Sequence, residues 1–135
     1  MAVNNAVTNI AGVVSAITTT IGYTDTTVTI GTLPPNAQIV NVHIDVLTAF
    51  DAGTTNQISV GYTGGTTTAY VVGTNVNAYG RQGINTTGVL SAWDPLVPAD
   101  SEVNVTCTYI KSGTAPTAGD ARVTVLYKSF SGTTN

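Results

Sequence analysis

Apolar and polar side chains alternate with a period of two in five separate stretches of this chain. The clearest stretch runs through Val40, Val42, Ile44 and Val46, with polar or charged residues at most positions between them. Successive side chains of an extended strand point to opposite faces, so such a stretch buries one face and leaves the other to solvent or to a partner. The alternation therefore predicts antiparallel strands that pack one face on a common core.

The amino-acid composition supports strands over helices. The 135 residues include 26 Thr and 18 Val, but only five Leu, one Met and one Glu. Thr and Val favour strands, whereas Leu, Met and Glu favour helices. A mainly helical protein is therefore excluded, and the lack of alternating strand and helix patterns excludes a Rossmann or TIM-barrel architecture. The length fits one domain.

Turn residues divide the chain into about eight predicted strands, a spacing typical of a sandwich or jelly roll. The predicted strands are 13–21, 27–33, 40–47, 57–62, 68–72, 84–92, 102–110 and 121–128. Gly31 interrupts the alternation of the second strand and predicts a β-bulge there. The segment 73–83 has three glycines and no period, which predicts a long loop of the kind that often carries binding residues.

We therefore predict an all-β protein with a single antiparallel β-sandwich domain of jelly-roll type. The sandwich is expected over residues 13–130, preceded by an N-terminal arm, 1–12, and followed by a polar tail, 131–135. The inward residues of the alternating strands form the predicted core: Val40, Val42, Ile44, Val46, Ile58, Val60, Val103, Val105, Cys107, Val123 and Val125.

The charged residues exclude several classes of function. The net charge is −3, and four basic residues are too few for the basic stripe of a nucleic-acid-binding protein. One Cys excludes a disulfide framework and a multi-cysteine zinc site, one His excludes a multi-histidine metal centre, and no cofactor is expected. Four hydroxyl residues interrupt the apolar stretch from Ile10 to Ile21, so we expect neither a signal peptide nor a membrane span.

His43 and Cys107 are the residues best suited to catalysis, but the sequence around each lacks the features of a catalytic site. Asp45 follows His43 on the same strand face and could orient its imidazole, but no Gly-x-Ser-x-Gly nucleophile motif accompanies them. Cys107 lies on an apolar strand face without a helix N-terminus to lower its pKa. Asp100 and Glu102 could share a calcium ion, although a solvated loop explains them more simply. We predict that the protein is not an enzyme.

Two further patterns lie in residues 33–62 and 103–127. The first combines the turn Leu33-Pro34-Pro35-Asn36, an alternating strand, the run Thr-Ala-Phe-Asp-Ala-Gly-Thr at 48–54, and Val60-Gly61. The second combines the strand Val-Thr-Cys-Thr-Tyr at 105–109 with a turn at 113–119 and a last alternating strand. With these patterns the chain resembles small structural proteins of tailed bacteriophages, of the capsid decoration (cement) and head-fibre kind. The resemblance implies a β-sandwich or jelly roll, often trimeric, on the outer capsid, and carries over no functional residues.

The resemblance leads us to expect a virion structural protein, made in the host cytoplasm, that decorates and stabilises the outer surface of a phage capsid. Its expected partners are the major capsid protein and two further copies of itself in a homotrimer, with no nucleic acid and no membrane. Because the chain has few charges, we expect the attachment to depend only weakly on salt. The candidate contact residues are Val3, Val7 and Ile10 in the arm, Tyr79 and Arg81 in the segment 73–83, and Trp93 in a proline-flanked loop.

The alternative is a carbohydrate- or receptor-binding module of a phage tail or fibre. Sugar binding needs exposed aromatic rings with polar groups beside them. Trp93 and Tyr79 could supply the rings, with Arg81 and Asp94 as the polar groups. The position of the protein on the particle, over the whole head or only at the tail tip, distinguishes the two hypotheses.

Overall fold

The computed structural model of the protein describes residues 13–83, 97 and 101–129. These residues form eight strands and no helix, and therefore contain no helix that could cross a membrane. The strands are β1 (Val14–Gly22), β2 (Thr27–Leu33), β3 (Gln38–Thr48), β4 (Thr55–Tyr62), β5 (Val71–Asn75), β6 (Gly80–Gly83), β7 (Val103–Ser112) and β8 (Asp120–Lys128).

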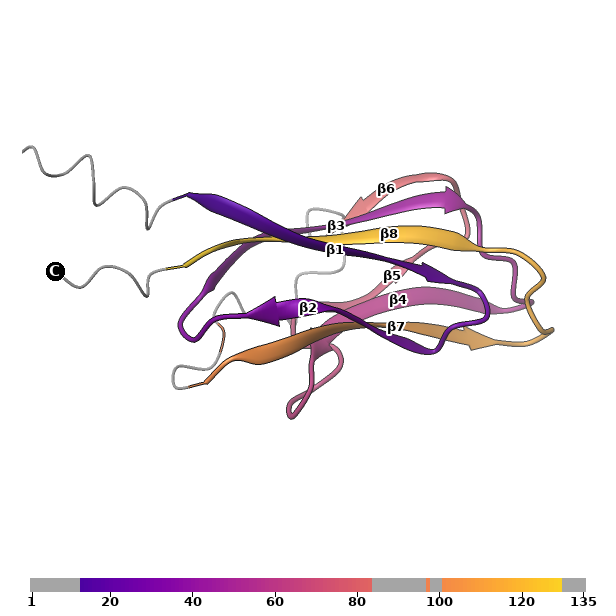
Figure 1. Ribbon diagram of the computed structural model, residues 1–135. Coiled ribbons are helices and arrows are strands. Elements are labelled where there is room, and N and C mark those ends of the chain that lie inside the picture. Colours follow the sequence, from indigo (N-terminus) through magenta and orange to yellow (C-terminus); the bar gives the residue numbers. More distant parts are fainter. Residues whose placement is uncertain (1–12, 84–96, 98–100, 130–135) are drawn as a thin grey trace, which may run out of the picture.

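The strands form two antiparallel four-stranded sheets that face each other (Figure 1). Sheet A has the order β1-β8-β3-β6, and sheet B has the order β2-β7-β4-β5. The pairs β1·β8, β2·β7, β3·β6 and β4·β5 are nested like the two arms of one long hairpin rolled up on itself, which is the arrangement of a jelly roll. The predicted all-β sandwich of jelly-roll type is confirmed.

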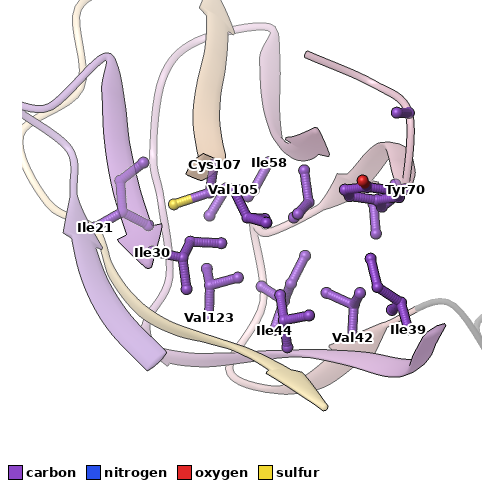
Figure 2. Close-up of a cluster of buried hydrophobic side chains, with 14 of the residues drawn as sticks. Ile21, Ile30, Ile39, Val42, Ile44, Ile58, Tyr70, Val105, Cys107 and Val123 are labelled. Carbon is purple, nitrogen blue, oxygen red and sulfur yellow. The ribbon is translucent and has the colours of Figure 1, made fainter. Parts of the chain in front are cut away.

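The core lies between the two sheets, where side chains from both inner faces meet (Figure 2). Ile44 and Val123 contribute from sheet A, and Ile58 and Val105 from sheet B; all four are fully buried. Burial of each such side chain contributes about 1.5–3 kcal/mol to folding. The predicted core is confirmed at every position except Val40.

Two of the four register shifts in the sheets bear on the sequence prediction. The bulge predicted at Gly31 is confirmed, because the register of β2 against β7 shifts between Thr29 and Gly31. A second shift, between Ile39 and Asn41 of β3, was not predicted. The extra residue there is Val40, which is 42% exposed, while Ile39 is buried in its place. The assignment of Val40 to the core is therefore wrong, because one inserted residue exchanges the two faces of the strand before it.

The segment 68–83 also differs from the prediction. The expected strand at 68–72 instead begins at Val71 and continues to Asn75. Residues 80–83 form β6 at an edge of sheet A, within the predicted loop. This strand has the sequence Gly-Arg-Gln-Gly, which has no large apolar residue and therefore shows no alternation of apolar and polar side chains. The predicted strand 84–92 lies outside the described residues, as do the arm 1–12 and the tail 131–135.

Candidate functional site

Tyr79 and Arg81 are the two predicted contact residues in the described part of the chain. Tyr79 lies between β5 and β6 and is 80% exposed. The next residue, Gly80, has a φ of +124°, a conformation that favours glycine and turns the chain into β6. The phenol ring therefore stands in solvent at a tight turn, where a partner can contact it. The other candidates, Val3, Val7, Ile10 and Trp93, lie outside the described residues.

Arg81 forms an ion pair with Asp45, its direct cross-strand neighbour on β3. Its Nε and Nη2 donate hydrogen bonds to Oδ1 and Oδ2 of Asp45 at 2.6 and 3.1 Å. These hydrogen bonds lower the pKa of Asp45, while partial burial of the carboxyl group acts in the opposite direction. Because the Arg81 side chain is 63% exposed, the pair adds little to stability. Its main consequence is that the charge of Asp45 is compensated within the protein.

His43 lies on the same outward face of β3, and its nearest polar partner is not Asp45. Its Nε2 lies 3.2 Å from Nδ2 of Asn41, while Asp45 bonds to Arg81. The hypothesis that Asp45 orients the imidazole of His43 therefore does not hold. This face of the sheet presents an ion pair and a separate histidine, not a catalytic dyad.

Cys107 points into the core from β7. Burial raises the pKa of its thiol to about 12, so the reactive thiolate is scarce at neutral pH. Its Sγ lies 3.7 Å from the carbonyl oxygen of Val28, to which it donates a weak hydrogen bond. Among the described residues, no three His, Cys, Asp or Glu side chains group as a metal site requires. Glu102 is described, whereas Asp100, its proposed partner for calcium, is not.

Arg122 is a surface residue whose neighbours in space could not be predicted from the sequence. It lies on β8 directly across from Asp45, so Asp45 stands between Arg122 and Arg81 in one row across three strands. The alternation of the last strand does predict that Arg122 and Lys128 point outward. That pattern carries no information about the strand order, which brings β8 beside β3.

The two sheets differ in charge. The strands of sheet A carry Asp45, Arg81, Asp120, Arg122 and Lys128, together with His43. In sheet B, the strands β2, β4 and β5 carry no charged residue, and β7 carries only Lys111. On β2 and β7 the outward side chains bond to one another instead, as in the pair of Thr27 and Thr108 hydroxyls 3.2 Å apart. The strands of sheet B thus carry a single charged residue, whereas those of sheet A carry five besides His43.

The loops at one end of the sandwich are joined through Asp51. Its Oδ1 accepts hydrogen bonds from the backbone N–H groups of Thr117 and Ala118, at 2.7 and 3.0 Å. Its Oδ2 accepts one from the Thr117 hydroxyl at 2.6 Å. The backbone N–H of Gly53 also donates to the carbonyl of Thr114 at 2.9 Å. The β3–β4 loop is therefore held by the β7–β8 loop as one structural unit.

A pH-dependent contribution to stability is expected from Asp51. The hydrogen bonds from Thr117 and Ala118 lower its pKa from the ordinary value of 3.8. Its contribution is therefore present above pH 3.8 and is lost as the pH falls through the lower value of the folded state. We expect the difference in Tm between wild type and Asp51→Asn to be constant near neutral pH and to close below about pH 4. A difference that does not change with pH in thermal unfolding would contradict this assignment.

A hollow of about 260 Å³ lies beside the same loops. Its lining comprises Ala52 and residues 111–116. The only charged group in the lining, Nζ of Lys111, donates a hydrogen bond to the carbonyl of Tyr23 and lies 5.4 Å from the ring centre of Tyr109.

Comparison with known proteins identifies relatives by fold only. No family model matches the chain, and no curated protein matches it. Two solved structures share the fold. A chain from the acidic stable capsid structure of Helicobacter pylori bacteriophage KHP30 superposes with a TM-score of 0.64 at 18% identity, covering 88% of this chain and 90% of that one. A chain from the capsid asymmetric unit of cyanophage Pam1 gives 0.58 at 20% identity, covering 86% and 84%.

Proposed function

We propose that this protein is a non-enzymatic structural component of a phage virion that decorates the outer capsid surface and stabilises it by binding the major capsid protein. The supporting observation is that the similarity to chains in two phage capsid structures extends over most of this chain and most of each neighbour. The match is therefore not limited to a module within a much larger protein. Jelly rolls are also a common architecture of viral capsid domains.

A homotrimer is the assembly that we propose. The uncharged edge strand β2 of sheet B supports self-association, because a second copy can cover it without removing an ion from water. Threonine hydroxyls both donate and accept hydrogen bonds, so a threonine-rich face can pair with the surface of an identical molecule. Thr27, Thr29 and Thr32 are exposed on the edge strand β2, where the hydroxyls of Thr27 and Thr32 also bond to Thr108 and Asn104 of β7.

The experiment that tests the function uses heads of a phage strain from which the gene has been deleted. Added wild-type protein is expected to occupy regular positions over the whole head, as seen by electron cryomicroscopy. Tyr79→Ala is expected to lower the affinity about 30-fold, as loss of an exposed aromatic contact does at an interface hot spot. Arg81→Ala and deletion of residues 1–12 should each lower it as well. If every variant reaches wild-type occupancy, these residues do not form the contact.

The receptor-binding alternative predicts a different result in the same experiment. The protein would then be found at the tail or fibre, and the heads would remain bare. That hypothesis uses Arg81 as a polar group beside Tyr79, but the Arg81 guanidinium already bonds the carboxylate of Asp45. Both hypotheses use this guanidinium, so the position of the protein on the particle, and not Arg81, distinguishes them.

A further inference from the structure

The basic residues of the protein are gathered on one surface. Arg81, Arg122 and Lys128, three of the four Lys and Arg residues, belong to sheet A and lie on strand positions that alternate with the buried ones. The same face carries Asp45 and Asp120, so its net charge is +3 − 2 = +1. The rest of the chain holds one basic and five acidic residues, a net charge of −4. The net charge of this face is therefore opposite in sign to that of the rest of the protein.

Because Asp45 is paired with Arg81, the guanidinium of Arg122 remains available to bind a partner. Both oxygens of Asp45 accept hydrogen bonds from Arg81, and Arg81 is the only residue with an ion pair to it within the described chain. Arg122 lies on the other side of Asp45, with an exposed side chain and no ion pair to any described residue. An exposed guanidinium can bind a carboxylate through two parallel hydrogen bonds.

Exposed apolar side chains adjoin the same row. Leu47 follows Val46 and Tyr79 precedes Gly80, so both stand next to the last residue pair of the β3–β6 ladder. Leu47 is 40% and Tyr79 is 80% exposed. Arginine and tyrosine are among the residues most enriched at interface hot spots. Two arginines in the row and Tyr79 beside it are of these types.

We infer that the outer face of sheet A, centred on Arg122, Asp45 and Arg81, binds an acidic protein surface, which under the proposed function belongs to the capsid shell. A net charge of +1 is too small to hold a nucleic-acid backbone. A second copy of the chain is the alternative occupant and is an outcome of the test below; two of its acidic residues, Asp25 and Asp51, already accept hydrogen bonds in their own loops. The grouping of cations also replaces the expectation of weak salt dependence with one of measurable salt dependence.

The test compares two charge reversals of equal size. Arg122→Glu changes the outer face of sheet A, and Lys111→Glu makes the same change of net charge at the end of β7 in sheet B. We expect Arg122→Glu to lower the affinity for protein-depleted heads at least tenfold, and Lys111→Glu to leave it within about twofold. Raising NaCl from about 50 to 500 mM should weaken wild type more than Arg122→Glu.

A second pair of variants covers the case in which Arg122→Glu does not fold. Leu47→Ser removes an exposed apolar side chain from this face, and Val72→Ser removes one of similar exposure from β5. Only Leu47→Ser is expected to weaken the binding to heads, by several-fold. Both residues are more than one third exposed, so both variants should fold.

Each other outcome would overturn the assignment. Equal losses from Arg122→Glu and Lys111→Glu would show an effect of net charge alone. If wild type binds the heads and neither Arg122→Glu nor Leu47→Ser binds less, the contact lies elsewhere while the proposed function stands. If Arg122→Glu changes the oligomeric state in analytical ultracentrifugation, the face joins copies of the chain. If wild type does not bind heads at all, the proposed function fails and this assignment with it.

Discussion

Replacement of Gly119 by alanine is expected to lower the free energy of unfolding by about 4 kcal/mol, through backbone strain and overpacking together. Gly119 has a φ of +150°, a conformation that residues with a Cβ rarely adopt. An added Cβ would also clash with three ring atoms of Phe50, which is buried in the core. The ring in turn packs against Tyr109, with 4.6 Å between the ring centroids, so a shift of Phe50 would disturb this contact.

Gly80→Ala is the matched control for this change. Gly80 also has a positive φ, +124°, but an added Cβ there would meet no atom within 4 Å. Its cost is therefore strain alone, about 1 kcal/mol. Urea unfolding of both variants separates the two contributions. If Gly119→Ala is no less stable than Gly80→Ala, the assignment of close packing between the β7–β8 loop and Phe50 is wrong.

Asn56→Leu is expected to destabilise the protein by about 3 kcal/mol, because it leaves buried polar groups without partners. Asn56 is 7% exposed, and its Oδ1 accepts hydrogen bonds from the backbone N–H of Ala52 at 2.9 Å and from the hydroxyl of Tyr109 at 2.6 Å. Its Nδ2 donates to the carbonyl of Ala52 at 2.9 Å. A leucine of similar size fills the space and satisfies none of these groups.

Tyr109→Phe distinguishes the hydroxyl from the rest of this network. It removes one donor and leaves both hydrogen bonds between Asn56 and Ala52 in place, so it should cost only about 1 kcal/mol. Guanidinium unfolding followed by circular dichroism measures both variants. Equal stability of wild type and Asn56→Leu would mean that the β3–β4 loop does not depend on Asn56.

The contact surface stays a prediction, and the structure shows only where two of its residues lie. Tyr79 and Arg81 were selected by residue type within a segment that lacked a period, and both prove to be exposed. The neighbours of Arg81 were not predictable, because Asp45 is 36 residues away in the sequence. Arg122 is farther still, and it reaches Asp45 only because β8 lies between β1 and β3.

The sequence by itself determined that the chain is built of strands and which face of most strands is buried. Both properties follow from side-chain size and alternation, which act within a few residues of the backbone. Only the tertiary structure decided that Val40 is exposed, that β6 exists, and that Asp51 bonds the backbone of Thr117, 66 residues away. A bulge, an edge strand and a bond between loops each depend on which strand lies alongside, and that choice is made by the packing of the whole sandwich.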